Sequence, residues 1–235
     1  GEKALTFKGD KKVTGVVTDN RELPCDMVIL SVGVRPATDL AVQAKLTIGS
    51  MKGIRVDETM MTSAPDIYAA GDVAETHDIA RNTWFLNAIW PCAFEQGRIA
   101  GFNMAGKKTA YPGSYRRNSI GNFIGIPAIS MGVTHAESCV MTSEDDEFRE
   151  IKVRTKDVYK KLVLRNGKLI GAILVGHTQK AGLMSILLRK QVYIADSIPM
   201  LMSERLSFTD LLPILRRNAD QFSEPEYKEL MDTGI

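Results

Sequence analysis

The first third of the chain alternates between short apolar runs and turn residues, as strands joined by tight turns do. Residues 4–8 alternate in polarity, Gly9 and Asp10 suit a turn, and residues 12–18 continue in strand-forming types. This pattern predicts a β-hairpin. Residues 27–32 form an unbroken apolar run, which fits a strand buried on both faces of a parallel sheet.

The middle of the chain mixes short extended segments with helices. We expect a short helix around 37–44, a strand over 53–57, an extended segment over 67–70, and a helix over about 92–105. Pro91 suits the start of that last helix, because the N–H that proline lacks has no partner in a first turn. Gly106 suits its end.

Beyond a boundary at Pro112 and Gly113 the pattern changes to antiparallel strands followed by helices. The candidate strands are 120–124, 128–132, 148–155, 159–165 and 169–175. Asn166-Gly167 joins the last two as a hairpin turn. A helix over about 180–191 and an apolar helical tail from Ile198 to about Leu215 complete the prediction.

The helical tail carries one apolar face, formed by Leu201, Leu206, Phe208, Leu211, Leu212 and Leu215. This face can pack inside its own domain or contact a second copy or partner, and the pattern leaves both open.

Composition narrows the functional classes. The chain has 235 residues with 44% hydrophobic and 25% charged residues and a net charge of +2, so we expect no field that recruits nucleic acid or anionic lipid. No run approaches the ~18 apolar residues of a membrane span, and the polar start does not predict a signal peptide. Three separated cysteines predict neither a disulfide framework nor a metal site and suit a reducing cytoplasm.

Two segments carry the chemical information. One is the apolar strand that ends in Gly33-Val34-Arg35-Pro36, and the other reads T-S-A-P-D-I-Y-A-A-G-D over residues 62–72. A strand that ends in Gly71-Asp72 lets a ligand approach a residue without Cβ and places a carboxylate at the carboxyl end of a parallel strand. The alternative for Asp72 is an Asx-turn that caps the next segment.

With these segments the sequence resembles the pyridine nucleotide-disulfide oxidoreductase superfamily, nearest to NADH oxidases, rubredoxin reductases and the flavin module of NAD(P)H nitrite reductase. The likeness continues through W-P-x-A-x-x-Q-G-R-x-A-G-x-N-M-A-G at residues 90–106 and through residues 159–172. It covers nearly the whole chain and weakens over the last forty or so residues.

The resemblance implies FAD as cofactor and NAD(P)H as co-substrate. Its implied flavin contacts are Gly71, Asp72, Val73, Pro91, Cys92 and Ala93. In the family, the carboxylate that matches Asp72 accepts a hydrogen bond from the ribityl chain. The start of the helix after Pro91 points at the pyrimidine side of the isoalloxazine, where its partial positive charge stabilises reduced flavin.

The sequence also lacks family features. It holds no G-x-G-x-x-G loop and no counterpart of the redox cysteine that many members carry. The resemblance therefore implies an α/β plus α+β fold in which residues 1–32 end an NAD-binding domain and residues 33–109 are the second half of a Rossmann-like FAD domain. Residues 113–235 would be an interface domain with an antiparallel sheet. On this interpretation NAD(P)H is bound by missing segments, and the chain is inactive alone.

We expect no catalytic residue in this segment. Cys92 near a helix start could be redox-active, or it could be a small buried side chain. Glutathione-reductase relatives carry a His with a Glu five residues later, but Val140 and Gly182 stand at that spacing from His135 and His177.

The first functional hypothesis is an FAD-dependent oxidoreductase that passes electrons from NAD(P)H to an acceptor, a homodimer in the cytoplasm with a possible acceptor protein as partner. The second is a non-catalytic assembly module that dimerises without binding flavin. The sequence identifies neither the acceptor nor the choice between NADH and NADPH.

Overall fold

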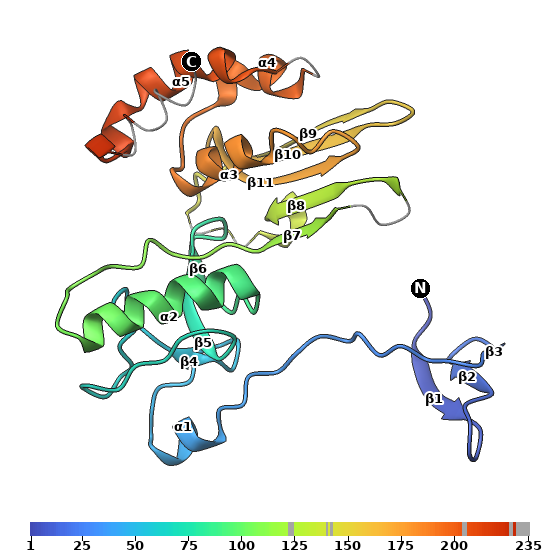
Figure 1. The fold of residues 1–235 in the computed structure, drawn as a ribbon. Coiled ribbons are helices and arrows are strands. Elements are labelled where there is room, and N and C mark those ends of the chain that lie inside the picture. Colours follow the sequence, from blue (N-terminus) through green and yellow to red (C-terminus); the bar gives the residue numbers. More distant parts are fainter. Residues whose placement is uncertain (122–124, 140, 142, 204–205, 226–227, 229–235) are drawn as a thin grey trace. The chain divides into compact units, whose positions relative to one another are not determined.

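Figure 1 shows the computed structural model of the chain, which describes residues 1–121, 125–139, 141, 143–203, 206–225 and 228. The chain divides between Arg35 and Pro36 into two compact units, Gly1–Arg35 and Pro36–Ile235.

The first unit is a three-stranded antiparallel meander. Its strands are β1 (Ala4–Lys8), β2 (Gly15–Thr18) and β3 (Glu22–Pro24), in the order β1-β2-β3. The predicted hairpin is confirmed, with β2 shorter than the predicted 12–18.

The prediction of a buried strand over residues 27–32 is wrong. These residues form no strand, and all their apolar side chains except that of Val28 are exposed, Val32 by 91%. No sheet of the described chain places a strand beside them. The apolar run has the composition of a buried strand but lacks the neighbours that would bury it.

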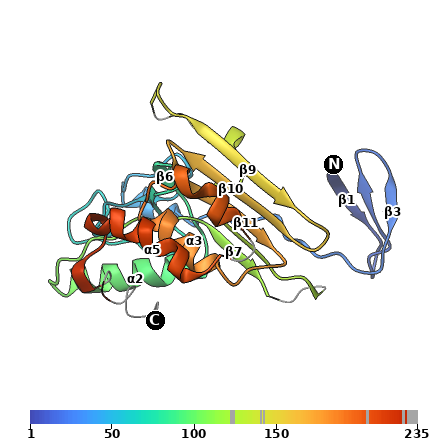
Figure 2. The ribbon, with the colours of Figure 1, turned by 90° about the horizontal axis from the view of Figure 1, so that it is seen from above.

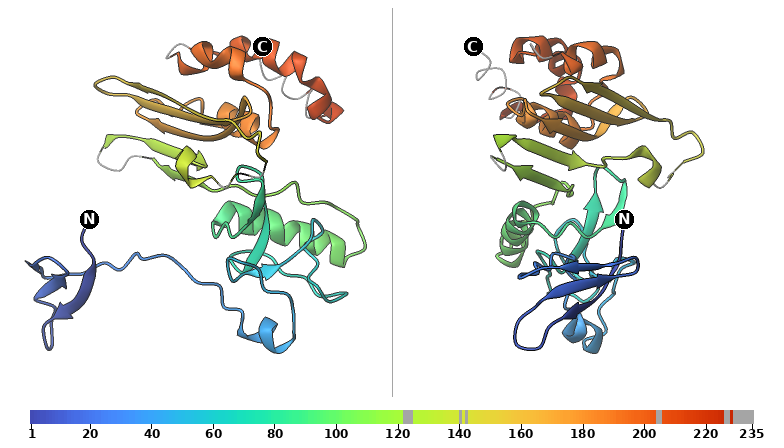
Figure 3. Two further views of the ribbon diagram at one scale, coloured as in Figure 1. Left: turned by 180° about the vertical axis from the view of Figure 1, so that it is seen from behind. Right: turned by 90° about the vertical axis from the view of Figure 1, so that its right-hand side faces the viewer.

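The second unit begins with a small α/β part. Its elements are α1 (Asp39–Gln43), β4 (Ile54–Arg55), β5 (Ala74–Asp78), β6 (Thr83–Phe85) and α2 (Trp90–Met104). β4 pairs with β5 in parallel, and β6 pairs with β5 in antiparallel. Figure 3 shows this part from behind and from the side, with α2 beside the strands.

Two strand predictions in this part need correction. The strand expected over 53–57 is reduced to the two residues of β4. Residues 67–70 form only an isolated bridge, between Tyr68 and Met61, so Gly71 does not end a regular strand. The hydrogen bonds of this segment go to a nearby turn, as from the N–H of Ala69 to the oxygen of Met60 at 3.1 Å, and not to a parallel neighbour.

The rest of the second unit is built on a five-stranded antiparallel sheet. Its order is β7-β8-β11-β10-β9, with β7 (Arg117–Ile120), β8 (Ala128–Gly132), β9 (Phe148–Arg154), β10 (Tyr159–Arg165) and β11 (Lys168–Val175). Asn166 and Gly167 turn between β10 and β11 with φ of 51° and 74°, as a type I′ turn requires. The first predicted strand, 120–124, is shifted to β7, and residues 122–124 lie outside the described residues.

Helices gather on one side of this sheet. They are α3 (Ala181–Arg189), α4 (Ile198–Met202) and α5 (Phe208–Arg217), with single turns at η3 (Ala195–Ser197) and η4 (Ala219–Gln221). A further single turn, η2 (Ala136–Ser138), contacts Glu150 of β9. Figure 2 shows α3, α4 and α5 from above, over the strands. The predicted tail is thus two helices, and a capping box of Ser207 and Asp210 starts the second one.

The apolar face of the tail packs into the core of its own unit. Leu201, Leu206, Leu211 and Leu215 are buried in one cluster with Leu162, Leu164, Leu187 and Leu188. The burial of these leucines favours packing of this face inside its own domain over contact with a second copy or a partner.

Glu150 on β9 contacts both η2 and β10. Its Oε1 accepts the N–H of Ala136 at 2.8 Å, and its Oε2 lies 2.9 Å from Nζ of Lys161 on β10. The hydrogen bond from Ala136 and the contacts with Lys161 and Lys152 lower the pKa of Glu150 to about 2. Lys161 is buried, and this carboxylate is the counter-charge within ion-pair distance of its ammonium group.

We expect Glu150→Gln to lower the free energy of unfolding at pH 7 by about 1–3 kcal/mol, because Lys161 then keeps a buried charge without a counter-charge. A lowered carboxyl pKa stabilises the fold above the unfolded pKa of about 4.5, and this stabilisation is lost as the pH falls toward 2. Urea unfolding of wild type and variant should therefore show a wide gap at pH 7 and a narrower one at pH 3. Glu137→Gln, at an exposed position of η2, is the control, and a gap that does not change with pH would contradict the prediction.

Candidate functional site

Gly71 lies where the segment after Tyr68 turns toward β5. Its φ is +83°, in the region that favours glycine, and its N–H donates to Oε1 of Gln96 on α2 at 2.8 Å. A Cβ at Gly71 would lie 3.6 Å from the Cβ of Ala93. The structure therefore brings Gly71 and Ala93 together, as the sequence predicts, although they are far apart along the chain.

Asp72 and Val73 follow directly. Asp72 is exposed and Val73 is half-buried, and the oxygen of Gly71 accepts the N–H of Ala74 at 2.9 Å, which leads the chain into β5. The Asp72 carboxylate is thus available to a ligand at the edge of this turn.

The first turn of α2 presents backbone N–H groups next to Gly71. The residue before the helix, Ile89, has extended backbone and caps it with no side-chain hydrogen bond, and Pro91 stands in the first turn. The partial positive charge of a 15-residue helix is therefore not neutralised by a side chain at this end. A group with partial negative charge is the ligand chemistry that such an end favours.

Cys92 faces away from solvent. Its Sγ lies 3.8 Å from the backbone oxygen of Tyr115, and burial raises the pKa of the thiol. The thiol is therefore protonated at neutral pH, which favours the structural role over the redox role. What Cys92 can offer a ligand is its backbone N–H.

The buried support of this site was not predicted from sequence. Gln96 is 1% exposed and holds Gly71, and burial raises the pKa of Tyr111, whose phenol lies near Gln96. Gln96 stands one turn after Ala93 in the W-P-x-A-x-x-Q-G motif, which is the only signal that could have pointed to it.

A second set of contacts joins the start of α2 to the five-stranded sheet and α3. Glu95 pairs with Nη2 of Arg189 at 3.0 Å and approaches Nη2 of Arg117 at 3.6 Å. The hydroxyl of Tyr115 forms a short hydrogen bond with Oγ of Ser185. These contacts hold the N-terminal half of α2 and the segment at Tyr115 against α3. No local sequence pattern predicts them.

The other candidate residues form no metal or catalytic cluster among the described residues. Within the described ranges no group of three or more His, Cys, Asp or Glu side chains is arranged to hold a metal ion. All three histidines are exposed, and the cysteines are free. None of the helices that the structure describes is both long and apolar enough to cross a bilayer.

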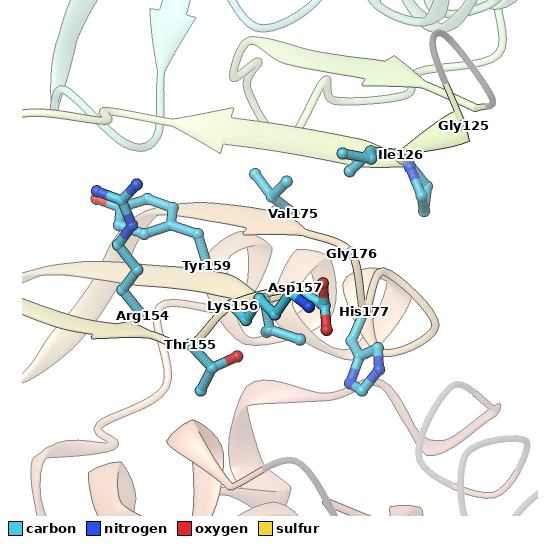
Figure 4. Close-up of a pocket in the computed structure, with 12 residues that line it drawn as sticks. Gly125, Ile126, Arg154, Thr155, Lys156, Asp157, Tyr159, Val175, Gly176 and His177 are labelled. Atoms are coloured by element: carbon cyan, nitrogen blue, oxygen red, sulfur yellow. The ribbon is translucent and has the colours of Figure 1, made fainter.

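A separate hollow of about 520 Å³ is open and charged. Its side chains come from the start of β8, the β9–β10 turn and the end of β11 (Figure 4). Arg154, Lys156 and His177 are exposed there together with Asp157. It shares no residue with the Gly71 turn or the first turn of α2.

Two family models match the chain. The pyridine nucleotide-disulphide oxidoreductase model matches residues 1–97, and the rubredoxin NAD+ reductase C-terminal domain model matches residues 119–192. Together they cover most of the chain and both of the parts described in the second unit.

Individual proteins agree with these models. The chain is 35% identical over 158 residues to a CoA-dependent NAD(P)H sulfur oxidoreductase of Pyrococcus furiosus, covering 67% of this chain and 35% of that protein. It is 33% identical over 211 residues to an NADH oxidase of Enterococcus faecalis, covering 83% and 47%. A crystal structure of an FAD-dependent pyridine nucleotide-disulphide oxidoreductase from Desulfovibrio vulgaris superposes with a TM-score of 0.70 at 28% identity, covering 83% of this chain and 50% of that one.

These three relatives are all oxidoreductases. The chain belongs to the pyridine nucleotide-disulfide oxidoreductase family, and its predicted fold class, mixed α/β with an antiparallel sheet, is confirmed. The chain spans between about a third and a half of the length of these three relatives.

Proposed function

We propose that this chain supplies one wall of an FAD site and the interface domain of an oxidoreductase that passes electrons from NAD(P)H through FAD to an acceptor. The observation that carries the proposal is the hydrogen bond from Gly71 to Gln96, which holds the Gly71-Asp72 turn against the first turn of α2. This turn offers a glycine and an exposed carboxylate, and the first turn of α2 beside it has no side-chain cap.

These features fit flavin. Asp72 would accept a hydrogen bond from a ribityl hydroxyl, and the start of α2, at Pro91, Cys92 and Ala93, would face the pyrimidine edge. When bound, the flavin supplies hydride and electron transfer, while the chain orients it and stabilises its negative charge. The proposed boundaries are 1–32 for the end of an NAD domain, 33–109 for the FAD half and 113–235 for the interface domain.

We further propose that the chain does not turn over alone, because its sequence has no G-x-G-x-x-G loop to hold a pyrophosphate. Dimerisation through residues 113–235 and a protein electron acceptor are the proposed partnerships. Three free cysteines fit a reducing compartment, for which we propose the cytoplasm.

A second function, an assembly module without flavin, is favoured by exposed apolar side chains among the described residues. Trp90 and Phe94 on α2 are 82% and 64% exposed, and in the first unit most apolar side chains from Met27 to Val34 are exposed. Such surface marks contacts with further protein.

A titration with FAD, monitored by flavin fluorescence, distinguishes the two proposed functions. We expect saturable binding that Asp72→Asn weakens about tenfold or more, because a hydrogen bond to a charged group contributes about 1.5–3 kcal/mol. Asp66→Asn is the matched control, since Asp66 is exposed in the preceding turn and asparagine tolerates its positive φ of 63°. A folded dimer, by light scattering, that binds no flavin would support the assembly module instead.

A further inference from the structure

A pocket of about 270 Å³ lies beside the first turn of α2. Pro91 of that turn forms one wall, Ile129 and Met131 of β8 form another, and Ala181 and Gly182 at the start of α3 form a third. Its volume stands just below the range of about 300–1,000 Å³ usual for ligand pockets. The pocket therefore suits a small molecule with a mainly apolar surface.

The pocket has one charged lining residue, Arg117. Glu95 lies 3.6 Å from the Arg117 guanidinium but is also paired with Arg189 at 3.0 Å, so it offsets the charge of Arg117 only in part. Ser185, also in the lining, is hydrogen-bonded to Tyr115. A phosphate or another multiply charged ligand would find a single guanidinium here, whereas a neutral molecule with a carbonyl group needs only the N–H donors of Arg117.

We propose that this pocket binds a small, uncharged, planar carbonyl compound of the quinone class as the electron acceptor. The choice of an acceptor rests on the proposed function, because Pro91 belongs both to the pocket wall and to the helix start that would face the flavin. The quinone would take two electrons and one proton, the hydride equivalent that NAD(P)H supplies in the proposed oxidoreductase. A second proton comes from solvent, and the products are quinol and NAD(P)⁺.

Gly182 allows the pocket to be filled without disturbing the fold. A Cβ at Gly182 meets nothing within 4 Å, and Gly182 lies in the first turn of α3, where a residue with a Cβ fits the helical backbone. Gly182→Leu therefore places a side chain in space that a ligand would occupy. Gly101→Leu is the matched control, because Gly101 on α2 also faces open space and does not line the pocket.

The test uses duroquinone, whose fully methylated ring leaves no free position for addition of a cysteine thiol. Titrated into this chain without flavin, it should bind saturably and shift the ¹³C-methyl signal of Met131 but not that of exposed Met104. We expect Gly182→Leu to weaken binding about tenfold or more, because its side chain overpacks an occupied pocket, and Gly101→Leu to leave it unchanged.

An unshifted Met131 signal, or equal binding by Gly182→Leu and wild type, would overturn the pocket assignment. FAD titration of the same samples separates the two proposals. Flavin binding without quinone binding would overturn the quinone pocket and leave the flavin site standing. Quinone binding at Met131 without flavin binding would support the pocket and count against the proposed function.

Discussion

Replacing Gly171 with alanine should abolish the folded five-stranded sheet. Gly171 on β11 lies opposite Gly132 on β8, and a Cβ at Gly171 would lie 1.6 Å from the backbone oxygen of Val133. Backbone atoms cannot rotate away as a side chain can, so the two strands must separate. Ile170 and Ala172 on either side are fully buried, so the separation would also open the core.

We expect the free energy of unfolding to fall by more than about 4 kcal/mol, which is at the extreme for a single substitution. Thermal unfolding followed by circular dichroism should show a strongly lowered midpoint or no cooperative transition. Gly182→Ala is the control, because its Cβ meets open space on α3 and should be neutral or slightly stabilising. Equal midpoints for the two variants would show that β8 and β11 do not approach as closely as the structure has them.

Elements with local signals were predictable from the sequence. Asn166-Gly167 specifies its turn by itself, because both residues tolerate positive φ, and β10 has the predicted bounds. Pro91 and Gly106 likewise place the ends of α2 within two residues of the prediction.

Elements that depend on distant partners were not predictable. Residues 27–32 have the composition of a buried strand, yet burial requires neighbouring strands that a local apolar run does not specify. The same holds for residues 67–70, which pair with a nearby turn.

The candidate site shows the same division. The family motif is enough to propose Gly71 and Asp72 as site residues, whereas the contact between Glu95 and Arg189 joins residues 94 positions apart with no shared periodicity. Gln96 is an intermediate case. The family motif contains this residue but does not indicate its role, and the structure shows that it accepts the N–H of Gly71.

Gln96 is therefore the residue whose removal should most change the flavin site without changing the fold. Methionine has similar length and helix propensity but no amide oxygen, so Gln96→Met leaves the N–H of Gly71 without its acceptor. Losing that hydrogen bond costs about 1–2 kcal/mol, so we expect the Gly71-Asp72 turn to open about tenfold more often and flavin affinity to fall by a similar factor.

Hydrogen exchange measured by NMR reports this opening even without flavin. Exchange of the Gly71 amide should accelerate about tenfold in Gln96→Met, while the amide of Ala100, in the interior of α2, keeps its rate. Arg98→Met, at an exposed position of the same helix, should change neither rate. If both amides accelerate together, Gln96 supports the whole helix. If only Gly71 accelerates and flavin affinity falls with it, Gln96 acts as a positioning residue that holds the turn in the form that binds flavin.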